Sequence, residues 1–75
     1  MTEEDDRVQT RFGRRMRAVR TAKKLSQEHV ALECGLSQTY ISEVESGKRN
    51  ISLQNIYRIA HALEMTMAEL MDGIP

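Results

Sequence analysis

Two groups of side chains that can recognise nucleic acid follow one another in the middle of this sequence. The first is Gln38, Thr39, Ser42 and Glu43, and the second is Lys48, Arg49 and Asn50. Glutamine can pair bidentately with adenine, threonine offers a hydroxyl and a methyl group to thymine, and a carboxylate can accept from cytosine N4 or repel a phosphate. The two cations and the amide donor of the second group can bind phosphate oxygens. We predict base readout by the first group and phosphate contacts by the second, provided that a helix carries the first into a DNA groove.

The stretch 26–50 contains the local signals of two short helices joined by a turn. Ser26 is a good N-cap for a helix that runs to about Cys34, and Gly35 follows where a left-handed residue ends it. Ser37 then caps a second helix. The inward-facing residues are predicted to be Val30, Ala31, Leu36, Ile41 and Val44. Two helices packed steeply across so short a turn let the second one enter a major groove.

The first of these two helices offers a further contact to DNA. Its unbonded backbone N–H groups, with the side chain of Gln27, are predicted to form a phosphate clamp. The side chain of Tyr40, in the second helix, can take one of two positions. Its ring can lie against the sugar-phosphate wall with the hydroxyl on a phosphate, or it can pack on the first helix. The residue types alone leave both open.

Charge is distributed unevenly along the chain, although the formal net charge is +0. Residues 1–6 carry four acids and no base, whereas residues 7–24 carry eight bases and no acid. The bases are Arg7, Arg11, Arg14, Arg15, Arg17, Arg20, Lys23 and Lys24. Such a run is either a solvated helix face or an electrostatic footprint for nucleic acid, and the lack of any acid in it favours the footprint.

An apolar stripe runs through the same basic segment. It consists of Val8, Phe12, Met16 and Val19, which are spaced as one face of a helix. The first seven residues have no such pattern and are predicted to be disordered or frayed. We therefore expect a single domain over residues 8–75.

Two further helices are predicted after residue 50. Ser52 caps the first, Ile51 and Ile56 form a hydrophobic staple, and the core face is Ile56, Ile59, Ala60 and Leu63. Thr66 and Glu69 form a capping box for a short helix that runs to about Asp72. Because no strand pattern occurs anywhere, we predict an all-α domain of five helices.

Length and composition limit the alternatives. A chain of 75 residues is one domain near the lower size limit for a core without disulfides or metals, so oligomerisation is an expected source of stability. The single cysteine, Cys34, rules out an intramolecular disulfide and is interpreted as a small core residue. No apolar run is long enough for a membrane span or a signal peptide, so we expect a cytoplasmic location.

The last eleven residues are rich in apolar side chains. They include Met65, Met67, Leu70, Met71 and Ile74, which are too many for one side of a two-turn helix. These five are predicted to form a homodimer interface, because DNA-binding domains of this kind pair so that two recognition helices reach successive major grooves. In the alternative interpretation, the methionines fill gaps in the monomer core.

The sequence contains no catalytic pattern. There is no Gly-rich phosphate loop, no nucleophile with a matching base, and no second ligand at metal-binding spacing from His29. We predict a protein that is not an enzyme and uses no metal or cofactor. The competing class is a protein-interaction module, such as an antitoxin that sequesters a toxin through the basic helix or the Met-rich end.

One continuous run of the sequence resembles a known family. LSQEHVALECGLSQTYISEVESGKRN, with FGRRMRAVR before it and ISLQNIYRIAHAL after it, is similar to the Cro/cI-type (XRE) helix-turn-helix domain, which has a compact lambda-repressor-like fold. TYISEVESGKRNISLQNIYRIAHAL is most similar to the controller proteins of restriction-modification systems. Phage-type repressors and antitoxins share this frame and are the alternatives.

The resemblance implies several properties. A controller binds, as a homodimer, two-fold symmetric double-stranded operators upstream of its own gene, recruits RNA polymerase at one site and blocks it when a second site fills. Tyr40 would contact the DNA backbone. An arginine late in the first helix and a glutamate near the end of the recognition helix form a salt bridge in phage repressors of this family, and these positions are Arg20 and Glu45 here.

Overall fold

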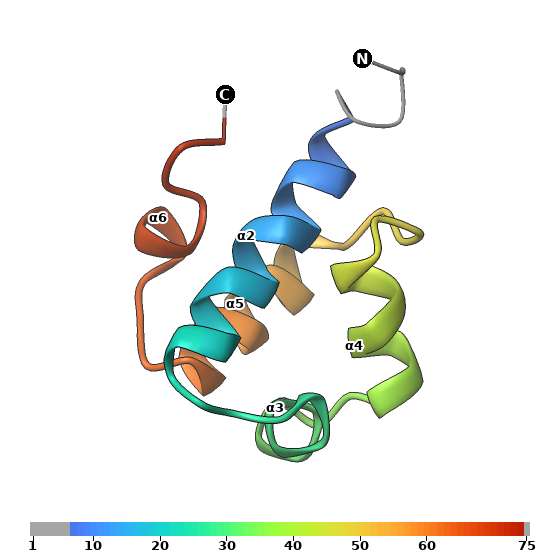
Figure 1. Cartoon of the computed structure of the whole chain (residues 1–75), viewed down its shortest axis with the longest axis vertical. Coiled ribbons are helices and arrows are strands. Elements are labelled where there is room, and N and C mark those ends of the chain that lie inside the picture. The colour runs from blue at the N-terminus through green and yellow to red at the C-terminus, as the bar shows by residue number, and fades with distance from the viewer. Residues whose placement is uncertain (1–6, 75) are drawn as a thin grey trace.

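A side-chain hydroxyl is the N-cap of four of the five helices in residues 7–74, the part of the chain that the computed structural model describes. Figure 1 shows how the helices are arranged. The helices are α2 (Val8–Ala22), α3 (Gln27–Cys34), α4 (Gln38–Glu45), α5 (Leu53–Ala62) and α6 (Met67–Leu70). No strand occurs in this part of the chain. The all-α prediction is confirmed, whereas the frayed segment predicted for residues 1–7 lies outside the described residues except for Arg7.

The four predicted N-caps are all formed. Each hydroxyl accepts from the backbone N–H three residues further on, at 2.9 Å for Ser26, 3.0 Å for Ser37, 3.1 Å for Ser52 and 3.0 Å for Thr66. The Thr66 N–H donates to Glu69 Oε1 at 2.8 Å, and the bonds with Thr66 lower the pKa of Glu69. Gly35 ends α3 at φ +73°, in the left-handed region. These local contacts set where α3 ends and α4 begins.

The helices meet in one core. Its buried apolar side chains are Phe12, Met16, Val19, Val30, Ala31, Cys34, Ile41, Val44, Ile59, Ala60, Leu63 and Leu70. Helix α2 packs on α4 and α6, and α3 packs on α4 and α5. The predicted core faces are confirmed except at Val8, which is 57% exposed. Val8 lies in the first turn of α2 and lines a small apolar cavity, which leaves more than half of its side chain open to solvent.

Leu70 is not available for the dimer contact that we predicted. Its side chain is fully buried in the monomer core, because α6 packs it between α5 and α2. Arg15 secures this arrangement by donating from Nη2 to the Glu69 carbonyl at 2.8 Å and from Nε to the Leu70 carbonyl at 3.3 Å. The other four residues of the predicted interface are partly buried against the same core: Met65, Met67, Met71 and Ile74. The assignment of Leu70 to the interface is therefore wrong.

A glycine that the sequence patterns did not single out sets the spacing between α2 and α4. Gly13 is buried in α2, and a Cβ there would lie 2.4 Å from the Val44 carbonyl oxygen and 2.6 Å from that of Glu45. Only glycine lets the two helices approach this closely. The recognition helix thereby keeps its C-terminal end against the middle of α2.

Candidate nucleic-acid interface

The base-reading residues predicted on α4 lie on its outer side. Gln38, Thr39 and Ser42 are exposed and Glu43 is half-buried, whereas Ile41 and Val44 face the core. Residues four apart in a helix lie above one another, so the outer residues form one surface along α4. The structure thus brings together the polar set that was predicted to meet base edges.

An ion pair holds α4 against the rest of the domain. Arg20 Nε lies 2.6 Å from Glu45 Oε2, and Arg20 Nη2 donates to Oε1 at 3.0 Å. Arg20 Nη1 also donates to the Leu25 carbonyl at 2.7 Å. The hydrogen bond with Glu45 raises the pKa of Arg20. The pair implied by the resemblance is formed, and it ties α2 and the link to α3 to the end of the recognition helix.

Gln27, the predicted phosphate clamp, contributes to the same cluster. Its Nε2 donates to Glu45 Oε1 at 3.0 Å. The Gln27 side-chain amide nitrogen has a second hydrogen that can donate elsewhere. The backbone N–H groups of Gln27 and Glu28 are also available, because the first N–H groups of a helix have no carbonyl one turn before them. The first turn of α3 therefore combines a structural bond to Glu45 with donors that suit a phosphate.

A second cluster joins α4 to the turn after it and to α5. Glu43 Oε1 accepts from Arg49 Nε at 3.1 Å and lies 3.0 Å from Nη2. The Arg49 guanidinium lies over the Tyr40 ring, 5.2 Å from the centroid, and the Tyr40 hydroxyl accepts from Asn55 Nδ2 at 3.0 Å. Tyr40 is partly buried against the core, and its own hydroxyl hydrogen remains able to donate to a phosphate.

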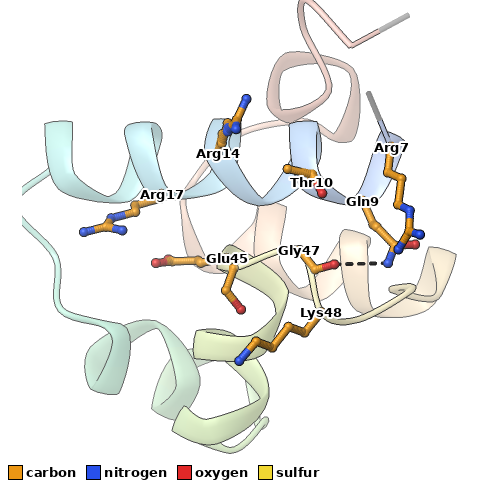
Figure 2. A pocket seen from close by; sticks show the side chains of 9 residues that line it. Arg7, Gln9, Thr10, Arg14, Arg17, Glu45, Gly47 and Lys48 are labelled. Carbon is orange, nitrogen blue, oxygen red and sulfur yellow. Dashed lines mark hydrogen bonds between the residues drawn. The ribbon is translucent and has the colours of Figure 1, made fainter. Parts of the chain in front are cut away.

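A basic groove lies between α2 and the turn that follows α4 (Figure 2). It encloses about 580 Å³ and is lined by Arg7, Gln9, Thr10, Arg14, Arg17, Glu45, Ser46, Gly47 and Lys48. Gln9 Nε2 donates to the Gly47 carbonyl at 3.0 Å and holds the turn against α2. The cations of the basic segment thus have different roles, since Arg15 and Arg20 stabilise the fold while Arg7 and Arg17 line this groove.

The arrangement of the helices and the sequence together identify the protein family. Residues 16–70 match the helix-turn-helix family. The chain belongs to the Cro/cI-type (XRE) helix-turn-helix family of DNA-binding transcription regulators.

Relatives of this helix-turn-helix chain include several control proteins. It is 47% identical over 62 residues to Control protein C.BamHI of Bacillus amyloliquefaciens, covering 81% of this chain and 76% of that protein. It is 41% identical over 68 residues to Control protein C.MunI of a Mycoplasma species, covering 89% and 92%. The crystal structure of the restriction-modification controller protein C.AhdI of Aeromonas hydrophila superposes with a TM-score of 0.81 at 48% identity, covering 83% and 94%.

The described part of this helix-turn-helix chain contains neither a metal-binding cluster nor a membrane-spanning helix. Within residues 7–74, no group of three His, Cys, Asp or Glu side chains is placed to hold a metal ion. No helix in the same range has the length and apolar character needed to cross a membrane. Burial raises the pKa of the Cys34 thiol, which lies in the core as predicted.

Sequence reasoning missed three residues that organise this helix-turn-helix site. They are Gly13, which sets the α2–α4 distance, Arg15, which holds α6, and Asn55, which holds the Tyr40 hydroxyl. Their partners are far away in the sequence, so no local spacing marks them. A glycine in the interior of the apolar stripe of α2 was the one usable signal, because glycine weakens a helix unless close packing requires it.

Proposed function

We propose that this chain is a restriction-modification controller, which binds a two-fold symmetric operator as a homodimer and regulates transcription from it, including that of its own gene. The similarity to control proteins over most of the chain carries this proposal. The exposed polar face of α4 supports it, since a regulator of this kind must present side chains to base edges. RNA polymerase is the further partner that control of a promoter requires.

The operator gives the direct test of this function. Binding-site selection from random duplexes, followed by footprinting, should yield two half-sites related by a dyad and separated by about 10–10.5 base pairs or a multiple of it. Recovery of no preferred sequence would overturn the proposal. A preferred sequence without two-fold symmetry would support a DNA-binding regulator but would contradict the proposed homodimer.

Base recognition and phosphate binding are assigned to different parts of the proposed interface. Gln38, Thr39 and Ser42 read bases, and Glu43 joins them where a base amine can donate to it. Phosphates are bound by the first turn of α3 with Gln27, by Tyr40, and by the turn that contains Lys48, Arg49 and Asn50. In the basic groove, Arg17 of α2 adds a further phosphate contact. The side chains of Arg17 and Lys48 have no hydrogen-bond or ion-pair partner among residues 7–74, which favours a phosphate as their ligand.

Alanine substitutions should separate the two roles. Gln38→Ala should weaken operator binding by about 1–3 kcal/mol, affect random DNA much less, and leave the salt dependence unchanged, because no cation is lost. Lys48→Ala should weaken binding to both kinds of DNA and lower the slope of log affinity against log salt by about 0.9 per phosphate contact, doubled in a dimer. Fluorescence anisotropy across a salt series measures both. A Lys48→Ala protein with altered base preference and an unchanged slope would reverse these assignments.

The dimer needs an interface other than Leu70, and the exposed apolar residues indicate one. Leu53 is 73% exposed and Tyr57 is 53% exposed, one turn apart on α5, and Val8 is 57% exposed on α2. An apolar cavity of about 260 Å³ is lined by Val8 and by Ile56, which lies between Leu53 and Tyr57 in the sequence of α5. Its full lining is Arg7, Val8, Gln9, Phe12, Asn50, Ile51, Ile56 and Met71. We propose that a second copy covers this face, with Leu53 of each copy entering the cavity of the other.

Two further features favour a second copy as the occupant. A protruding side chain and a cavity on one face are self-complementary, which a two-fold interface requires. Asn50 connects this face to the phosphate-contacting turn, so two copies joined here would also be adjacent on DNA. Met71, one of the five residues that the sequence predicts for the interface, lines this cavity.

Leu53→Asp should therefore separate the copies without unfolding them. A charge at the centre of the interface should raise the dimer dissociation constant at least about tenfold, and operator binding should fall with it, because one half-site holds a single domain weakly. Sedimentation velocity measures the assembly, and circular dichroism should show unchanged helix content. A Leu53→Asp protein that remains dimeric would place the interface elsewhere.

A further inference from the structure

The outer face of α4 carries one acidic side chain, on the surface where a phosphate-rich ligand is proposed to dock. That residue is Glu43, since the only other acid of α4, Glu45, is buried in its pair with Arg20. The Glu43 carboxylate is bonded to Arg49, and the two side chains are 36% and 51% exposed. An exposed pair of this kind is weak, so a competing anion can displace the carboxylate from the guanidinium.

Arg49 is held at this place by more than the carboxylate. Its guanidinium lies over the Tyr40 ring, which in turn is fixed by the bond from Asn55 to the Tyr40 hydroxyl. The contacts with Glu43 occupy the Nε hydrogen and one Nη2 hydrogen of Arg49, which are the adjacent donors that a phosphate binds bidentately. A phosphate that takes these two donors displaces the carboxylate, so Glu43 loses its partner when Arg49 binds the DNA backbone.

We propose that Glu43 is a specificity-determining residue that penalises binding to random DNA. This inference rests on the proposed function and deepens it. On random sequence, Arg49 moves to a phosphate and leaves an unpaired carboxylate facing the phosphate backbone, which repels it. On the operator, a base amine, N4 of cytosine or N6 of adenine, donates to the freed carboxylate and replaces the guanidinium. The penalty is then removed only at the correct sequence.

The test is the substitution Glu43→Gln, which keeps the shape and removes the charge. Its matched control is Glu33→Gln on the exposed side of α3, which makes the same change in net charge away from the α4 face. Affinity for a random duplex should rise about threefold to tenfold for Glu43→Gln and less than about twofold for the control, at low salt. Operator affinity should stay the same or fall, so the ratio of operator to random affinity should drop at least about threefold.

A double substitution tests whether Glu43 acts through Arg49. In the Arg49→Ala protein, the carboxylate is unpaired both before and after binding, so Glu43→Gln should raise random-duplex affinity by a smaller factor than it does with Arg49 present. Equal factors in the two backgrounds would overturn the coupling, and equal gains on operator and random DNA would overturn the specificity role. If the gain in random-duplex affinity is no larger for Glu43→Gln than for Glu33→Gln, the effect comes from net charge alone and the proposal is wrong. Failure to select any operator would instead count against the proposed function, because the random-duplex measurements do not need one.

Discussion

Glu45→Ala should destabilise this domain severely. Glu45 is 7% exposed and accepts hydrogen bonds from both Arg20 and Gln27, so its removal leaves a guanidinium near the core with one carbonyl partner. Breaking a buried pair by deleting one partner costs about 3–5 kcal/mol. Domains of this size lose about 4–8 °C in Tm per kcal/mol, so the melting temperature should fall by at least about 12 °C. Thermal unfolding followed by circular dichroism measures it.

Two controls separate the lost pair from the lost charge. Glu33→Ala removes an exposed acid and should melt within a degree or two of the parent protein. Replacing both partners, in Arg20→Leu with Glu45→Leu, should recover part of the loss, since no uncompensated charge is left in the interior. If Glu45→Ala melts like Glu33→Ala, the pair does not stabilise the fold.

Leu70→Asp should prevent folding at ambient temperature. Removing the apolar part of a fully buried leucine costs about 2–5 kcal/mol by itself. A carboxylate in the same place must also be buried without a partner or be protonated. A domain of 75 residues has only about 4–11 kcal/mol of stability to lose.

The comparison with Leu53→Asp makes this result informative. The two proteins carry the same substitution, at a side chain that is 0% exposed in one and 73% exposed in the other. Leu70→Asp should show a loss of helix signal at all protein concentrations, whereas Leu53→Asp should keep its helices and lose only its assembly. A folded, monomeric Leu70→Asp protein would restore Leu70 to the dimer interface and remove it from the core.

Features that depend on neighbours in the chain could be predicted from the sequence. The four caps at Ser26, Ser37, Ser52 and Thr66, and the left-handed Gly35, are formed as predicted, because each involves atoms within a few residues. The apolar faces of the helices were predictable for the same reason, since the period of a helix decides which side chains share a side. The polar face of α4 follows directly from these faces.

Features that depend on distant partners were decided by the tertiary structure. The C-terminal methionines and Leu70 have the same apolar character, and only the packing of α6 against α2 and α5 buries Leu70 fully and the others in part. Likewise, Glu43 and Glu45 are two residues apart on one helix. The geometry of α4 turns Glu45 inward to Arg20 and leaves Glu43 outside with Arg49, because successive helical residues point in different directions and the surrounding helices determine which direction is the core.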